Sequence, residues 1–274
     1  MLTLVRFLLV SLSIAAILGE ATIHLRRERL DIMTNGLGLD GAYYATLDRI
    51  KGQSEGKSAL AMAALMWISR SKRPMRAEEL CEALAVKIGS RDMECDNIPS
   101  EKTLLGSCLG LITVDESSIV RLVHFTLQEY FNSHPEHFEN AESTMAEICL
   151  TYLNFDSINK FSLSLDRAPV GTRLLRYASS YWGLYARTGL TEGAKSLALQ
   201  LLSKCGRHIS TLILLVENPN DSRAIDRGLR HSEGFTGLHC AAYLGLDEIV
   251  IALLDEGEGC GASRVDGIGY TPLA

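Results

Sequence analysis

The chain has 274 residues, of which 47% are hydrophobic and 22% charged, and this globular composition excludes a disordered or low-complexity protein. Its formal net charge of −6 argues against a nucleic-acid-binding surface, because neutralising phosphates requires an excess of Lys and Arg. The seven cysteines are scattered and contain no C-x-x-C pair. We therefore expect reduced thiols in a cytoplasmic protein, with no disulfide framework, metal site or cofactor.

Residues 1–50 predict two or three helices. The beginning of the chain also permits a signal peptide over residues 1–21, because Arg6 precedes an apolar run at residues 7–18 and a small-x-small cleavage site follows it. That alternative would make the product secreted or membrane-anchored. We favour a buried helix of a cytoplasmic protein, and we expect no membrane span, since the run is shorter than about 20 residues.

Three helices are predicted between residues 59 and 110. Residues 59–69 are apolar all round, which predicts a fully buried helix. Residues 77–84 follow with acidic side chains in the first turn and apolar side chains at i,i+4 spacing. Residues 101–109 predict the third helix, which Gly110 ends as a C-cap.

Two β-like runs come next, at residues 111–114 and 119–125, and the polar residues 115–118 between them predict a hairpin turn. Thr126 opens a T-x-x-E capping box and is the predicted N-cap of a closing helix. Three helices, a hairpin and a closing helix in this order are the pattern of a winged-helix domain, which we place at residues 59–133.

The remainder of the chain is predicted to be helical, with apolar stripes through residues 143–202 and a polar boundary at residues 218–232. We predict a mainly α fold with four parts: a helical segment at residues 1–58, the winged-helix domain at 59–133, a helical linker region at 134–233, and the C-terminal residues 234–274.

The C-terminal part contains a repeated motif. Residues 234–242 read G-F-T-G-L-H-C-A-A, a second apolar helix follows at residues 247–254, and a G-Y-T-P-L motif begins at Gly269. Thr271 lies 35 residues after Thr236, close to a repeat period of about 33. The pattern resembles one ankyrin repeat and part of a second. Since such units need stacked neighbours, we expect the chain to be a piece of a larger scaffold.

Three further blocks carry a second resemblance: A-L-M-W-I-S at residues 64–69, P-M-R-A-E-E-L-C-E-A-L at 74–84, and V-R-L-V-H-F-T-L-Q-E-Y-F at 120–131. Together they resemble the winged-helix region that follows the NTPase core in NACHT-ankyrin proteins of filamentous fungi. These belong to the STAND class of signal-transduction ATPases, which includes NOD-like receptors. The resemblance implies an oligomerising switch that self-associates in its parent protein, with ankyrin repeats as the sensor, and it makes residues 1–58 a remnant of the NACHT core.

Under this resemblance, His124 stands where related switch ATPases carry a histidine that contacts the β-phosphate of bound ADP. The chain lacks a Walker A loop, because Gly52 and Gly56 are separated by three residues and Lys51 stands where the first glycine belongs. Residues 52–58 are expected to form a solvated loop. We therefore assign His124 a nucleotide contact only in a full-length parent, and by itself we expect it to pack as a core residue.

Ankyrin repeats bind protein partners through their turn tips and concave face. The exposed candidates for partner binding are Phe235, Gly237, Ser263, Asp266 and Tyr270. His239 matches the ankyrin T-P-L-H histidine, whose family role is to hydrogen-bond the backbone between repeats.

No residue is expected to be catalytic. Family catalogues attach an inositol-deacylase name to this kind of winged helix, but that activity would need a G-x-S-x-G nucleophile elbow, and we expect none in this chain. His134 and His137 lack the i,i+4 spacing of a helical zinc site and are expected in a surface turn.

The sequence therefore predicts a non-enzymatic protein-interaction and signalling module, without a nucleic-acid or membrane partner. One alternative is a DNA-binding winged-helix regulator, although the candidate recognition helix at residues 101–109 offers one Lys against one Glu, and the turn that follows is acidic. The other alternative is a small secreted or membrane-anchored protein.

Overall fold

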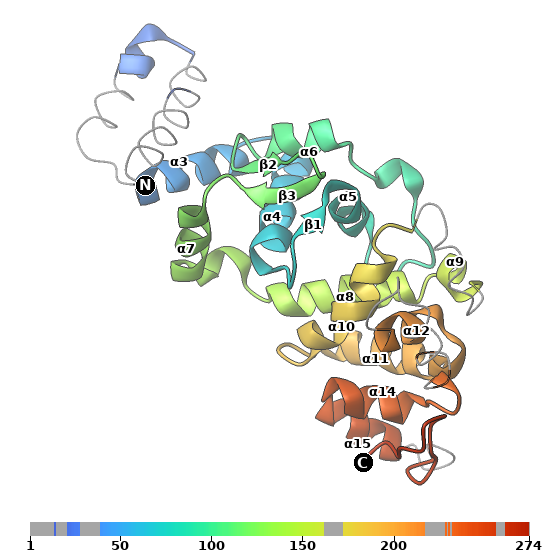
Figure 1. Ribbon diagram of the computed structural model, residues 1–274. Coiled ribbons are helices and arrows are strands. Elements are labelled where there is room, and N and C mark those ends of the chain that lie inside the picture. The colour runs from blue at the N-terminus through green and yellow to red at the C-terminus, as the bar shows by residue number, and fades with distance from the viewer. Residues whose placement is uncertain are drawn as a thin grey trace. The chain divides into compact units, whose positions relative to one another are not determined.

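The computed structural model describes residues 14, 21–27, 39–161, 172–216, 228, 230, 232–255 and 261–273. These residues form a mainly helical fold with one small antiparallel sheet (Figure 1), which confirms the predicted fold class. They group into two compact units: Met1–Ala77 with Ser100–Glu139, and Glu78–Pro99 with Asn140–Ala274. Among the described residues, no helix combines the length and apolarity that a membrane span requires.

Some predictions fall outside the described residues. The possible signal peptide at residues 1–21 does so except for Ile14 and Ala21, and so does most of the boundary at residues 218–232. The predicted four-part division of the chain stays a prediction.

The first unit combines helices with a small sheet. Its elements are α3 (Leu39–Lys51), α4 (Glu55–Arg70), β1 (Met75–Arg76), α6 (Glu101–Ser107), β2 (Ile112–Val114), β3 (Ile119–Leu122), α7 (Phe125–Ser133) and the 3-10 helix η2 (Pro135–Phe138). The second unit is helical. Its elements are most of α5 (Ala77–Ala85), η1 (Cys95–Asn97), α8 (Ala141–Leu153), α9 (Asp156–Asn159), α10 (Leu175–Ala186), α11 (Glu192–Leu202), η3 (Cys205–Arg207), α12 (Ile209–Leu215), α14 (Gly237–Leu244) and α15 (Asp247–Asp255).

The sheet of the first unit has the strand order β1-β3-β2, and both neighbouring pairs are antiparallel. Met75 lies opposite Val120, and Ile112 lies opposite Leu122. Because side chains alternate along a strand, Val120 is buried while the neighbouring Arg121 is exposed. The buried face packs against α4 and α7, so the hairpin predicted from residues 111–125 is present, with β3 ending at Leu122.

Two helix predictions in this unit need correction. The helix over residues 59–69 is not fully buried: α4 buries Ala61, Ala64, Leu65 and Trp67, but Ala59 is exposed. An apolar composition overestimates burial, because much of any protein surface is apolar. The third helix ends at Ser107 and not at residue 109, since Leu109 (φ 47°) and Gly110 (φ 86°) both adopt left-handed backbone conformations.

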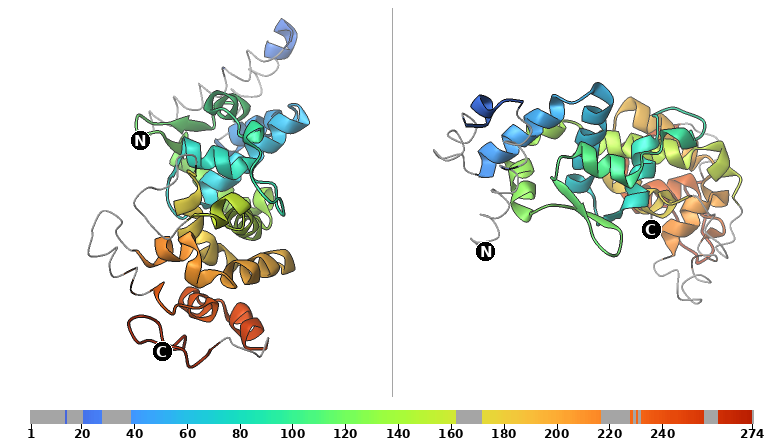
Figure 2. Two further views of the ribbon diagram at one scale, coloured as in Figure 1. Left: turned by 90° about the vertical axis from the view of Figure 1, so that its right-hand side faces the viewer. Right: turned by 90° about the horizontal axis from the view of Figure 1, so that it is seen from above.

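In the second unit, α8 is the central helix. It packs against α10 and α11, and α11 packs in turn against α14 and α15. Figure 1 and the left view of Figure 2 show this order, from the yellow-green α8 through the orange α11 to the red α14. The predicted apolar stripes supply the core, where Met145, Cys149 and Tyr185 are fully buried.

A buried carboxylate ties three helices of this unit together. Glu82 of α5 is 5% exposed, and its Oε2 accepts hydrogen bonds from the Leu174 backbone N–H at 2.9 Å and from the Tyr152 hydroxyl at 3.3 Å. Leu174 is the N-cap of α10 and provides no side-chain acceptor of its own. Glu82 therefore satisfies a helix start from a distant part of the sequence. Burial, and secondly the charge of Glu82, raise the pKa of Tyr152 and keep its hydroxyl protonated.

We expect Glu82→Ala to lower the free energy of unfolding by about 3 kcal/mol, because it leaves a buried N–H and a buried hydroxyl unpaired. Glu82→Gln keeps an acceptor oxygen and should cost less. The matched control is Glu78→Ala on the same helix, which breaks an exposed 3.1 Å ion pair with Arg173 and should cost under about 1 kcal/mol. Urea unfolding followed by circular dichroism measures all three variants, and equal losses for Glu82→Ala and Glu78→Ala would contradict the assignment.

Candidate functional site

His124 lies between β3 and α7 in the first unit. Its backbone is extended (φ −156°, ψ 152°), and its Nδ1 accepts a hydrogen bond from the Thr126 backbone N–H at 3.3 Å. His124 is therefore the N-cap of α7. The prediction that Thr126 is the N-cap is wrong, because the helix already begins at Phe125 and places Thr126 inside its first turn.

A chain of hydroxyl groups supports this cap. The Thr126 Oγ1 lies 2.8 Å from His124 Nδ1 and 2.7 Å from the Tyr43 hydroxyl. Since Nδ1 accepts from a backbone N–H, a neutral His124 carries its proton on Nε2. Thr126 then donates to Nδ1, and Tyr43 donates to Thr126. Burial raises the pKa of Tyr43 against the opposing bond to Thr126, so the phenol stays a donor. The half-buried ring presents Nε2–H as its remaining donor, which suits an anionic acceptor.

A G-x-S-x-G pattern, which the sequence-based prediction overlooked, occupies Gly52-Gln-Ser-Glu-Gly56. A nucleophile elbow needs a strand before the serine and a helix after it. Here α3 ends at Lys51, so a helix and not a strand precedes the turn. Ser54 is the exposed N-cap residue of α4. The pattern is thus a helix–helix turn, and the loop predicted over residues 52–58 is shorter, since Glu55 already begins α4.

The two histidines after α7 contact Tyr130. The His134 ring stacks on the Tyr130 ring with centroids 4.3 Å apart, and His137 Nε2 lies 3.2 Å from the Tyr130 hydroxyl. Burial, and secondly the nearby Lys51, lower the pKa of His137. Both histidines are half-buried packing residues around a 3-10 turn. In the described ranges, no group of three or more His, Cys, Asp or Glu side chains is arranged to hold a metal ion.

The hairpin turn of the wing is built around Asp115. Its Oδ1 accepts from the backbone N–H groups of Ser117 and Ile119 at 2.9 and 3.0 Å, and its Oδ2 lies 3.3 Å from Arg121 Nε. The bond from Ile119 contributes most to lowering the pKa of Asp115, so the carboxylate stays charged. The wing thus carries a fixed anion that pairs with its own cation, which disfavours phosphate binding.

The C-terminal motif forms two antiparallel helices, α14 and α15, joined at Gly245 in the left-handed conformation (φ 64°). Thr236 and His239 form a capping box: Thr236 Oγ1 accepts from the His239 N–H at 3.4 Å, and His239 Nδ1 accepts from the Thr236 N–H at 3.1 Å. His239 Nε2 then donates to the Tyr270 carbonyl at 3.1 Å. One ring therefore caps its own helix and bonds to the backbone of the next motif.

The candidate partner-binding residues divide into two groups. Ser263 and Tyr270 are exposed, as predicted. Phe235 and Asp266 are buried (3% and 5% exposed), so the prediction that they are exposed is wrong. Phe235 packs beside the His239 ring at a centroid distance of 5.3 Å, and Asp266 Oδ1 accepts from the N–H groups of Ile268 and Tyr270 to shape the turn.

Gly237 is half-exposed, but it is not free to project toward a partner. A Cβ at this position would lie 2.6 Å from the Leu202 carbonyl oxygen at the end of α11. Glycine therefore allows α14 to approach α11 closely, and this contact explains why it replaces the proline of the resembled motif.

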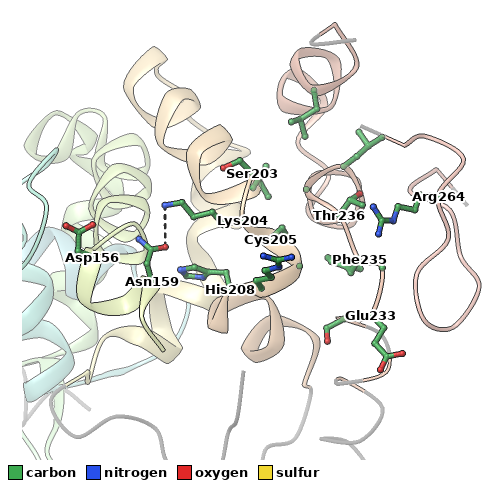
Figure 3. A pocket seen from close by; sticks show the side chains of 18 residues that line it. Asp156, Asn159, Ser203, Lys204, Cys205, His208, Glu233, Phe235, Thr236 and Arg264 are labelled. Atoms are coloured by element: carbon green, nitrogen blue, oxygen red, sulfur yellow. Dashed lines mark hydrogen bonds between the residues drawn. The ribbon is translucent and has the colours of Figure 1, made fainter. Parts of the chain in front are cut away.

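A cavity of about 1020 Å³ lies beside this motif in the second unit (Figure 3). Lys204, Cys205 and Arg207 line it from the segment after α11, and Phe235 and Arg264 line it from the C-terminal motif. His208, also in the wall, is the N-cap of α12: its Nδ1 accepts from the Ser210 N–H at 3.2 Å and lies 2.6 Å from the Ser210 hydroxyl. This is the same arrangement that His124 makes with Thr126.

Comparison with known proteins identifies one part of the chain. Residues 47–146 match the family model described as GPI inositol-deacylase, winged helix domain. The match covers the elements from the end of α3 into α8, including the sheet and His124. Neither the comparison with curated proteins nor that with solved structures found a match. The predicted winged helix is thereby confirmed.

We expect His124→Ala to destabilise the first unit by about 1 kcal/mol, because α7 loses its N-cap acceptor. His124→Asn restores a short acceptor and should recover most of that loss. Urea unfolding of the full chain compares the two variants. If Asn is as damaging as Ala, the ring contributes by packing and not by capping.

His208 should make the protein sensitive to acid. Burial lowers the pKa of His208 from 6.5 to about 4; the nearby Leu153 carbonyl opposes this shift, and the charge of Lys204 adds to it. Between these pH values the unfolded chain binds a proton that the folded chain does not, so stability falls as the pH drops from 6.5 toward 4, by about 3 kcal/mol in all. In His208→Asn, which keeps a cap acceptor but does not titrate, the loss of unfolding free energy between pH 7 and pH 4.5 should be smaller by about 2 kcal/mol. An identical loss in both proteins would refute the assignment.

Proposed function

We propose that the chain is a non-enzymatic protein-interaction and signalling module, in which the winged helix restrains an NTPase core of the NOD-like receptor type and the C-terminal motifs form an ankyrin-type partner-binding array. The ankyrin-type role of the C-terminal motifs rests on the hydrogen bond from His239 to the Tyr270 carbonyl. It joins two successive copies of a motif at the position where ankyrin-like units stack on one another.

The arrangement of the C-terminal motifs supports the ankyrin assignment further. The residues of the motif have distinct structural roles, since Thr236 and His239 cap α14, Gly245 permits the reversal between the helices, and Asp266 fixes the following turn. Exposed apolar side chains gather in the same stretch of sequence, namely Tyr243, Ile251, Val265, Ile268, Tyr270 and Leu273. Exposed apolar side chains in such number are typical of a surface that another protein or a further repeat covers.

His124 supports the first half of the proposal. The cap leaves Nε2–H as a fixed donor at the junction of β3 and α7, within the part of the chain that matches the winged-helix family. A fixed N–H donor can contact a phosphate oxygen, which is the role that the resemblance to switch ATPases implies. The residues that would bind the rest of the nucleotide would belong to the NTPase core of the parent protein. The Gly52–Gly56 turn does not offer the serine nucleophile of a hydrolase as an alternative, because the strand that precedes a nucleophile elbow is replaced by a helix.

The interaction role can be tested by photocrosslinking. A photoreactive amino acid is introduced at Ser263 or Tyr270 in the full chain, and at exposed Lys102 on α6 as the control. In an extract of the cells that produce the protein, we expect the first two positions to yield the same protein adduct and Lys102 to yield none. Equal labelling at all three positions, or adducts of the chain only with itself, would refute the proposed binding surface.

A further inference from the structure

The cavity beside the C-terminal motif is bordered by positive charge. Three cations line it from three places in the second unit: Lys204 just after α11, Arg207 in η3 and Arg264 in the C-terminal loop. All three are exposed, and within the described part of the chain none of them forms an ion pair. Lys204 donates to the neutral Asn159 amide oxygen at 3.4 Å (Figure 3). The three charges therefore face the cavity without being neutralised by a salt bridge.

Two carboxylates also line the cavity, but they do not cancel this charge. Asp156 belongs to α9, and Glu233 precedes the C-terminal motif. In Figure 3 they lie at opposite ends of the view, Asp156 at the left edge and Glu233 at the lower right. Three cations thus accompany two carboxylates in a chain whose net charge is −6. An excess of cations around one cavity of an acidic protein favours an anionic ligand.

His208 adds a buried donor to the same wall. Its side chain is 3% exposed, and its Nδ1 accepts from the Ser210 N–H at 3.2 Å, so the neutral ring carries its proton on Nε2. Nε2 is buried without a hydrogen-bond partner, since the nearby Leu153 carbonyl lies outside hydrogen-bond geometry. Figure 3 shows the ring on the side of the cavity where Lys204 and Asn159 lie. A buried N–H without an acceptor is unfavourable, and an anion in the cavity would supply the acceptor.

The N-terminus of α14 borders the cavity as well. Its N-cap Thr236 and its first two residues, Gly237 and Leu238, line the wall. The first N–H groups of a helix have no acceptor within it and carry a partial positive charge, which favours a nearby anion. The helix start, the three cations and His208 therefore border one volume of about 1020 Å³. A volume of this size accommodates a ligand with several oxyanion groups.

We propose that this cavity binds a small soluble ligand that carries two or more phosphate groups. Lys204 and Arg264 lie on different sides of the cavity in Figure 3, so a ligand with more than one phosphate contacts both. Arginine offers paired N–H donors that match a phosphate, and lysine offers a compact charge. The inference does not rest on the proposed partner-binding array, because it concerns a small molecule and is tested on the purified chain alone.

The test is isothermal titration calorimetry of the purified full chain with sodium tripolyphosphate, compared with inorganic phosphate. We expect one saturable site that binds tripolyphosphate more tightly than inorganic phosphate by about tenfold or more, because several phosphates are held at once. The affinity should fall as sodium chloride is added. The absence of saturable binding at about 5 mM tripolyphosphate would overturn the proposal.

Arginine variants separate a built site from general attraction. Arg207→Gln and Arg264→Gln should each weaken tripolyphosphate binding by about tenfold, because each loses charge-assisted hydrogen bonds. The matched control is Arg176→Gln on α10, an exposed arginine that does not line the cavity and whose loss changes the net charge equally. Circular dichroism melting checks that all three variants are folded. Equal weakening in all three would show that net charge alone attracts the ligand, and the site would be refuted.

Lysine acetylation locates the ligand independently of its affinity. Tripolyphosphate should slow the acetylation of Lys204 severalfold and leave exposed Lys102 on α6 unchanged. Equal protection of both lysines would contradict the assignment. Sedimentation with vesicles that contain bisphosphorylated phosphatidylinositol tests a lipid headgroup as the source of the phosphates. Binding to these vesicles without binding to free tripolyphosphate would overturn the proposal that the ligand is soluble.

Discussion

The first backbone N–H groups of a helix have no partner within the helix, and this chain, built from many short helices, must satisfy them repeatedly. Among the helices that the structure describes, histidine does so at α7, α12 and α14. His124 caps α7, His208 caps α12, and His239 completes the capping box of α14, in each case through Nδ1. At α10 the acceptor comes from elsewhere in the sequence, since Glu82 of α5 accepts the Leu174 N–H. The three histidine caps are local, whereas the Glu82 bond joins α5 to the start of α10 across 92 residues.

Because Nδ1 is an acceptor in all three histidines, their neutral rings carry the proton on Nε2, and the environment of that atom decides what each ring does. His239 donates to the Tyr270 carbonyl and so joins two successive copies of the C-terminal motif. His208 is buried, and its lowered pKa predicts that stability depends on pH. His124 is half-buried and keeps its donor available. The same capping bond to Nδ1 is thus found in three histidines with different roles, because their Nε2 atoms lie in different environments.

Short sequence patterns are informative here only with their structural context. The turn at Gly52–Gly56 satisfies the letters of a nucleophile elbow and approaches those of a Walker A loop, yet it joins two helices, and both chemistries require a preceding strand. Phe235 and Asp266 were predicted to contact a partner on sequence grounds, but they serve the fold, one beside His239 and the other within the turn.

The sequence by itself determined the mainly helical class, the hairpin and the closing helix of the winged helix, because these depend on periodicity and turn residues that are local in the chain, but it missed the two-residue strand β1. The role of His239 came from the resemblance of its motif to an ankyrin repeat. The sequence-based prediction placed the N-cap of α7 two residues too late, because the T-x-x-E motif does not show where strand β3 ends. Only the tertiary structure brought Glu82 to α10 and the start of α14 to the end of α11, because such contacts join residues that are far apart in sequence. A sequence pattern alone does not show which helices lie close enough together to make these contacts.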